Sequence, residues 1–213
     1  AGAVSKNETV TCTVTPSDGT DTGTAGSDSV TVVNTAPVLS AVTIAPASGV
    51  TTSSSLSCSV TASDADGETL SEDYTWTNGS TTLGTASTLS LTNTTSSPTD
   101  TITCSVTVTD SSSATASGSA SVSVENTLPE IASVSISPTD PTVTDTVSCS
   151  VSASDSDGDT PSESFSWTYG STVLGTSASL DLSTTSQSKG DTVSCKVTVT
   201  DDQGDTAVDS ASV

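Results

Sequence analysis

The sequence predicts an all-β chain built from tandem two-sheet sandwiches, and a repeated pattern of cysteine and tryptophan is the main reason. A cysteine is followed by a tryptophan 18 positions later and by a second cysteine 46 positions later, and this pattern occurs twice. The two sets, 91 positions apart, are Cys58, Trp76 and Cys104, and Cys149, Trp167 and Cys195. The pattern is typical of a sandwich in which the cysteines bridge the two sheets and the indole packs on the bridge. Because the repeat is in register, we predict two sandwiches of the same design.

Alternation of residue types is the second observation. Composition alone favours disorder, because the chain is rich in Ser and Thr and carries a formal net charge of −22. Residues 101–109 nevertheless alternate without a break between Thr or Ser and Ile, Cys or Val, as a strand with one buried face does. Threonine has good strand propensity and suits the outer face of a sheet. No stretch shows helical periodicity, so we expect strands only and a thin core.

The expected strands follow the same order in both repeats. In the first repeat they lie around residues 42–44, 56–62, 74–76, 88–91, 101–109 and 119–124. In the second repeat they lie around residues 134–136, 147–151, 165–167, 180–182 and 193–199. Asn78-Gly79 is a strong signal for a hairpin turn after the tryptophan strand.

The cysteines are expected to pair within each repeat, Cys58 with Cys104 and Cys149 with Cys195. In the chain-entropy model, a disulfide that closes a loop of about 47 residues stabilises a domain by about 4 kcal/mol. That is a large share of the stability of a small domain. Dependence on disulfides indicates an oxidising compartment, so we expect a secreted or cell-surface protein. Cys12 stands at a second-cysteine position whose partner would lie upstream, and a free thiol is the alternative.

The 91-residue period divides the chain into three parts. Residues 1–33 look like the C-terminal strands of a preceding repeat, residues 34–125 form a complete repeat, and residues 126–213 form a second repeat whose last strand is truncated. An Asn-Thr-x-Pro sequence stands at each junction, at residues 34–37 and 126–129, directly after a strand. Proline restricts the backbone, so these junctions are either short semi-rigid joints or ordinary strand-to-strand turns.

Three features together resemble the immunoglobulin-like domains of the PKD and cadherin-like kind, which occur in tandem in large microbial surface proteins. They are the Cys–Trp–Cys pattern, the Val-Thr-Val-Thr-Asp endings at residues 106–110 and 197–201, and the Asn-Thr-x-Pro junctions. The resemblance covers nearly the whole chain and implies immunoglobulin-like β-sandwich repeats. The chain departs from PKD domains at residues 74–79, and from antibody-type domains by having Ile102 and Val193 where a tyrosine is expected. The resemblance therefore supports an architecture more than a particular ligand.

Two acidic loops are the candidate metal sites, with Ca²⁺ as the candidate cofactor. Alternating carboxylates beside a glycine place several oxygens within reach of one hard cation, as Ca²⁺ requires. The eight candidate ligands are Asp64, Asp66, Glu68 and Asp110 in the first repeat, and Asp155, Asp157, Asp159 and Asp201 in the second. Asp110 and Asp201 close the second-cysteine strand, whose end lies near this loop in a sandwich. The alternative is a tight turn in which Asp caps its own backbone and glycine adopts positive φ.

Composition also argues against several functions. With three lysines, no arginine and a strongly negative net charge, the chain is not expected to bind nucleic acid. It has no histidine and therefore no imidazole general base, and its carboxylates lie in turns rather than in a cleft, so we expect no enzyme. No apolar run is long enough to span a bilayer.

Two functions remain open. The first is a structural, non-catalytic spacer in an extracellular or cell-surface rod or filament, with neighbouring repeats or identical subunits as partners. The second is an adhesin module that binds a glycan or a protein through its loops. Binding usually leaves exposed aromatics, and only Tyr169 falls outside the core pattern here, which favours the spacer. We expect a window on a long tandem array, with strand donation between chains as the alternative.

Overall fold

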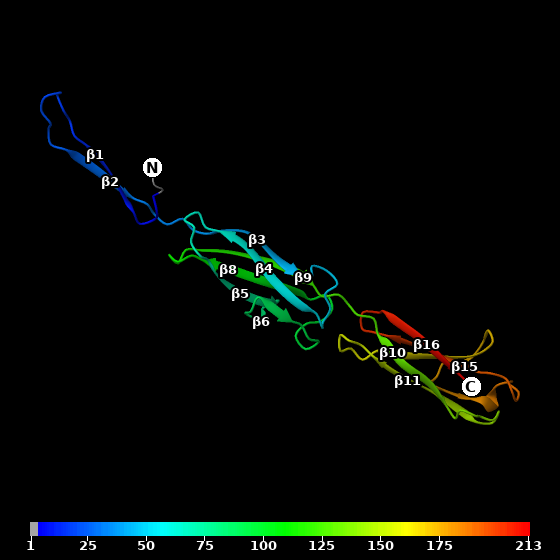
Figure 1. The fold of residues 1–213 in the computed structure, drawn as a ribbon. Helices are drawn as coiled ribbons and strands as arrows, with labels where there is room; N and C mark the ends of the chain where they lie inside the picture. The colour runs from blue at the N-terminus through cyan, green and yellow to red at the C-terminus, as the bar shows by residue number, and fades with distance from the viewer. Residues whose placement is uncertain (1–3) are drawn as a thin grey trace. The chain divides into compact units, whose positions relative to one another are not determined.

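The computed structural model describes residues 4–213, in which β-strands are the main regular secondary structure (Figure 1). The one helical segment in that range is a short 3₁₀ turn, η1, at Leu182–Thr184, and no helix there is long and apolar enough to cross a membrane. The all-β prediction is therefore confirmed. The chain groups into two compact units, one of residues 1–47, 56–89 and 101–122 and the other of residues 48–55, 90–100 and 123–213.

The first two strands form a hairpin without a buried face. β1 (Thr9–Val14) and β2 (Gly26–Thr31) pair antiparallel. Every residue of both strands is exposed, including Cys12, which has no disulfide partner among the described residues. This hairpin therefore contributes strands but no packed core of its own.

The first sandwich consists of a three-stranded and a four-stranded sheet. The smaller sheet has the strand order β3-β4-β7, and the larger has the order β6-β5-β8-β9. The strands are β3 (Val38–Ala45), β4 (Ser55–Ser63), β5 (Ser71–Asn78), β6 (Thr81–Gly84), β7 (Thr88–Ser90), β8 (Thr101–Thr109) and β9 (Thr115–Ser123). The predicted turn joins β5 to β6, with Gly79 at a φ of +54°.

The second sandwich repeats this topology. Its sheets have the strand orders β10-β11-β14 and β13-β12-β15-β16. The strands are β10 (Glu130–Ser137), β11 (Thr146–Ser154), β12 (Ser162–Tyr169), β13 (Thr172–Gly175), β14 (Ser179–Asp181), β15 (Ser194–Thr200) and β16 (Thr206–Ser212). The identical order of strands agrees with the repeated sequence pattern.

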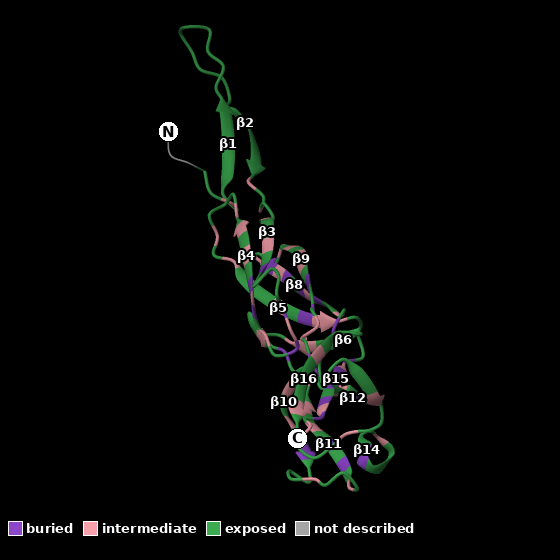
Figure 2. Ribbon diagram, turned by 90° about the vertical axis from the view of Figure 1, so that its right-hand side faces the viewer, coloured by how far each residue is buried: buried purple, intermediate pink, exposed green. Residues whose placement is uncertain are grey.

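Alternation along the strands explains which faces are buried. On β8, the side chains of Ile102, Cys104, Val106 and Val108 are buried, and the hydroxyl residues between them are at least partly exposed. Successive side chains of a strand point to opposite faces of its sheet, so this alternation produces one apolar face. In Figure 2 the buried residues occupy short stretches of the strands and of the loops between them, and exposed residues cover most of the chain. The core is thin, as the composition predicts.

A disulfide joins the two sheets of each sandwich. Cys58 on β4 bonds to Cys104 on β8, and Cys149 on β11 bonds to Cys195 on β15. The Cα–Cα distances are 6.5 and 6.4 Å, within the usual range for a disulfide. The predicted pairing is confirmed, and each bridge ties a strand of the small sheet to the central strands of the large one.

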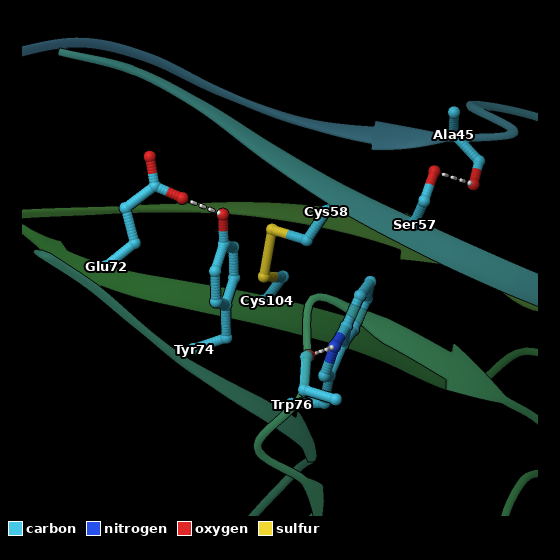
Figure 3. Close-up of a disulfide and its surroundings, with 8 residues drawn as sticks. Ala45, Ser57, Cys58, Glu72, Tyr74, Trp76 and Cys104 are labelled. Carbon is cyan, nitrogen blue, oxygen red and sulfur yellow. Dashed lines mark hydrogen bonds between the residues drawn. A yellow bond between two sulfur atoms is a disulfide. The ribbon is translucent and has the colours of Figure 1, made fainter.

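Each disulfide has a tryptophan beside it. Trp76 lies directly opposite Cys104 across the β5–β8 pair, and its indole lies next to the disulfide in Figure 3. Trp167 has the same place opposite Cys195. Both tryptophans are fully buried, and each indole Nε1 donates a hydrogen bond to a backbone carbonyl, at 2.9 and 3.0 Å. The largest core side chains are therefore buried without an unpaired donor.

Replacing Trp167 by Ala should destabilise the second sandwich by about 3–5 kcal/mol, the usual cost of removing a large buried aromatic side chain. Denaturant unfolding with the disulfides intact measures this loss. Tyr169→Ala is the matched control, because Tyr169 lies on the same strand and is 39% exposed. A Trp167→Ala protein that melted within about 2 °C of the parent would contradict the sandwich core described above.

Candidate cation sites beside the Asn-Thr junctions

The two acidic loops occupy equivalent places, each directly after the strand that carries the first cysteine of its repeat. Their carboxylates are Asp64, Asp66 and Glu68 after β4, and Asp155, Asp157 and Asp159 after β11. In the first loop, one oxygen from each of the three carboxylates lies within 4.8 Å of the other two. In the part of the chain that the structure describes, no other three acidic, His or Cys side chains converge to this distance.

Both loops form the tight turn that was the alternative to a metal site. Oδ1 of Asp64 accepts a hydrogen bond from the backbone N–H of Asp66 at 2.7 Å, and Asp155 and Asp157 are related in the same way at 2.7 Å. Gly67 follows in the first loop with a φ of +76°, and Gly158 follows in the second with a φ of +91°, values that glycine adopts without a steric penalty. Capping occupies only one oxygen of the first aspartate. The turn and a metal site are therefore compatible.

Several oxygens around the loops are buried without a hydrogen-bond partner. At the first loop these are Oδ2 of Asp64 and Oε2 of Glu68, whose side chain is only 7% exposed. At the second loop they are Oδ2 of Asp155, Oδ2 of Asp159 and Oδ1 of Asn126. An unpaired buried acceptor costs free energy, and carboxylate and amide oxygens are the ligands that Ca²⁺ prefers. The donor set therefore fits a hard cation.

Asp110 uses both of its carboxylate oxygens within the protein. Oδ1 accepts hydrogen bonds from the backbone N–H groups of Ser112 and Ala114 at 2.9 and 2.8 Å, and Oδ2 accepts one from Asn34 Nδ2 at 2.8 Å. The Asn34 hydrogen bond is the largest influence on the pKa of Asp110; with the backbone donors and the charge of Lys6, it lowers that pKa against the opposing effect of burial. Asp110 thus holds the junction asparagine in place.

Asp201 has the same role at the second loop. Its Oδ1 accepts hydrogen bonds from the backbone N–H groups of Gln203 and Asp205 at 3.0 and 2.7 Å, and its Oδ2 accepts one from Asn126 Nδ2 at 2.9 Å. Burial acts to raise the pKa of Asp201, but the hydrogen bonds from Asn126 and from the backbone outweigh it, so the pKa lies below its usual value. Asn126 Nδ2 also donates to Asp205 Oδ2 at 2.9 Å, which turns the Asn126 amide nitrogen toward carboxylates and its Oδ1 away from them.

The threonine of each junction contacts the second aspartate of the acidic loop. Thr35 N donates to Asp66 Oδ2 at 2.6 Å. Thr127 donates from both its N and its Oγ1 to Asp157 Oδ2, at 2.7 and 2.8 Å. Sequence reasoning treated the Asn-Thr pairs only as junctions. The signal that links them to the loops is that one Asn-Thr pair precedes each acidic loop.

Asp157 is held more firmly than its counterpart Asp66. Within the second compact unit, Thr52 Oγ1 donates to Asp157 Oδ1 at 2.8 Å, and the two residues are 1% and 6% exposed. Asp66 is exposed. Thr52 was missed from the sequence because it lies 105 positions from Asp157 and belongs to no motif.

Negative charge accumulates around the second loop. Burial is the largest influence on Asp159 and raises its pKa. The surrounding carboxylates raise it further; they are Asp202, Asp155, Asp157 and Asp201. A carboxyl group in this position is more easily ionised when a cation compensates its charge. At the first loop a protein cation is present, since Lys6 forms an ion pair with Glu68.

No protein-family model and no curated protein matches the chain. Among solved structures, it is similar to the three N-terminal domains of the bacteriophage RB49 highly immunogenic outer capsid protein, with 18% identity over 84% of this chain and 58% of that one, and a TM-score of 0.30. It is also similar to a Ca²⁺-stabilised adhesin of an Antarctic bacterium, with 18% identity over 96% of this chain and 55% of that one, and a TM-score of 0.32. A third similar structure is the human desmocollin-1 ectodomain, with 15% identity over 97% of this chain and 44% of that one, and a TM-score of 0.31. The chain spans about half the length of these three. At such identities the likeness concerns the fold alone.

Replacing Asp157 by Asn should destabilise the protein by about 1–3 kcal/mol in the absence of any metal, because an amide group cannot accept all the hydrogen bonds that reach this buried carboxylate. Thermal unfolding in chelator measures the effect. Asp66→Asn is the matched control, since Asp66 is exposed and accepts one junction hydrogen bond. Equal, small losses of stability for the two variants would show that the burial of Asp157 does not contribute to the stability of the protein.

Proposed function

We propose that the chain is a structural, non-catalytic spacer of an extracellular or cell-surface rod or filament, and that its acidic loops bind Ca²⁺ beside the Asn-Thr junctions. The observation that carries this proposal is the set of buried, unpartnered oxygens at both acidic loops, directly beside the Asn-Thr junctions. Two disulfides support the location, because such bonds persist in oxidising compartments.

A spacer needs resistance to unfolding more than it needs a pocket. Each sandwich has a thin apolar core that is joined across its sheets by one disulfide and filled by one large indole. Such a domain stays folded while exposing a surface composed mainly of Thr and Ser. The repeated topology lets equivalent units follow one another, as in other repeat proteins.

Ca²⁺ would be held by the free oxygens at each loop. At the second loop the residues that would hold it are Asp155, Asp159 and Asn126. Because Asn126 belongs to the junction and Asp155 to the loop after β11, one ion would join two segments of the second compact unit. Burial and neighbouring carboxylates raise the pKa of Asp159, and the ion would compensate the charge of those carboxylates.

Calorimetric titration with Ca²⁺ should show heat of binding, and Ca²⁺ at about one hundred times its Kd should stabilise the folded protein by about 2.7 kcal/mol. Asp159→Asn should weaken binding, whereas Asp140→Asn, a change at an exposed aspartate outside both loops, should leave it unchanged. Absence of heat, together with the same melting temperature in Ca²⁺ and in chelator, would leave only the turn interpretation.

The rod itself is tested on native material. Electron microscopy or small-angle scattering should detect a thread with a repeat along its length. A compact, globular monomer of about the mass of this chain would contradict both the tandem array and the strand-donation version of the proposal.

An adhesin is the second candidate, and Tyr169 is the residue that favours it. Its side chain is 39% exposed, and its hydroxyl donates to Asp191 Oδ1 at 3.0 Å. Exposed tyrosines are frequent in binding surfaces. A glycan array probed with the wild-type protein and with Tyr169→Ala distinguishes the two functions: binding that the substitution abolishes would establish the adhesin, and no binding favours the spacer.

A further inference from the structure

The ammonium group of Lys6 lies at the first acidic loop. It forms an ion pair with Glu68 and donates hydrogen bonds to Asn34 Oδ1 at 3.3 Å, to Ser112 Oγ at 2.7 Å and to Ser111 Oγ at 3.4 Å. All of these residues belong to the first compact unit. A single positive charge therefore contacts both the carboxylate of the loop and the amide oxygen of the junction.

The second loop has no lysine at the equivalent position. Two pairs of backbone hydrogen bonds show which residues of the two units correspond. In the first unit, Asn7 N donates to Val32 O and Val32 N donates to Glu8 O. In the second unit, Thr99 N donates to Val124 O and Val124 N donates to Asp100 O. Asn7 and Thr99 also share a positive φ, of 65° and 74°. These matching hydrogen bonds align Lys6 with Pro98, which is buried and uncharged.

The residues around the two loops differ in a way that also favours a cation at the second loop. Asn34 Oδ1 accepts a hydrogen bond from Lys6, whereas Asn126 Oδ1 is buried without a partner. Where the first unit has Ser111 and Ala114, the second has Asp202 and Asp205. The second loop thus has more carboxylates, an additional free oxygen and no lysine in place of Lys6.

The spacing of the carboxylate oxygens also differs between the two loops. Oxygens of Asp64, Asp66 and Glu68 lie within 4.8 Å of one another, and those of the second loop, as described by the structure, do not converge to this distance. Two carboxylates about 4 Å apart near a protein surface repel each other by several times the thermal energy, and a cation among them offsets this repulsion. The ammonium group at the first loop is such a cation.

We propose that Lys6 is a tethered cation that occupies the place of a metal ion at the first acidic loop, so that the chain has one metal-independent junction and one that requires a divalent cation. This inference rests on the proposed binding of Ca²⁺. The first loop keeps only weak affinity for Ca²⁺, because an incoming ion must displace the ammonium group from Glu68 and Asn34. The second loop binds Ca²⁺ first.

Amide NMR signals of Gly67 and Gly158 report on the two loops separately during a titration with Ca²⁺ alone. In the wild-type protein the Gly158 signal should shift at a Ca²⁺ concentration at least about tenfold lower than the Gly67 signal, given the charge that Lys6 supplies at the first loop. In Lys6→Gln the Gly67 signal should shift at about tenfold lower concentration than in wild type, with Gly158 unchanged.

Two controls separate charge from folding. Lys6→Arg keeps the positive charge and should behave like wild type, and Lys196→Gln removes an exposed lysine on β15 and should change neither signal. In chelator, Lys6→Gln should melt at a lower temperature than wild type, and Ca²⁺ should reverse this loss.

The outcomes distinguish the inference from the proposed function. If Gly158 responds to Ca²⁺ and the response of Gly67 is the same in wild type and Lys6→Gln, Ca²⁺ binding stands and the role of Lys6 is wrong. If neither glycine responds in either protein, Ca²⁺ binding itself is wrong, and the inference is overturned with it.

Discussion

The inter-sheet disulfide is the interaction on which the rest of each sandwich depends. Few large apolar side chains are available, so each core is built around one cystine and one indole, which lie opposite each other on adjacent strands. Closing a loop of this length stabilises the fold by about 4 kcal/mol in the chain-entropy model. With that contribution in place, the outward faces of the strands need no apolar residues, and a Thr- and Ser-rich sequence folds where its composition alone would favour disorder.

The fold could be predicted from the sequence because its determinants are local or repeated. Alternation along residues 101–109 specifies a strand with one buried face, and the two copies of the Cys–Trp–Cys pattern specify the pairing of the sheets. The exposed hairpin of β1 and β2 has the same alternation but no partner sheet among the described residues. Alternation predicts a strand; burial depends on what packs against it.

The candidate sites could be predicted only in part. Spacing identified the acidic loops, because their aspartates and glycine lie within a few residues of one another. It could not identify Thr52 or Lys6, whose contacts with Asp157 and Glu68 connect segments distant in sequence. Nor could it reveal that both oxygens of Asp110, a predicted ligand, accept hydrogen bonds from Asn34 and the backbone. Such assignments depend on which atoms meet after folding.

Charge compensation unites the two loops despite their differences. In a chain with a net charge of −22, gathering carboxylates in a half-buried loop is unfavourable, and positive charge supplied there reduces the cost. A lysine supplies it permanently and independently of the medium, at the cost of one fixed side chain. A free divalent cation supplies more charge and more ligand contacts, but only where its concentration is sufficient. A tandem protein that uses both would have some acidic loops whose charge is compensated in any medium and others whose charge compensation depends on the divalent cations around them.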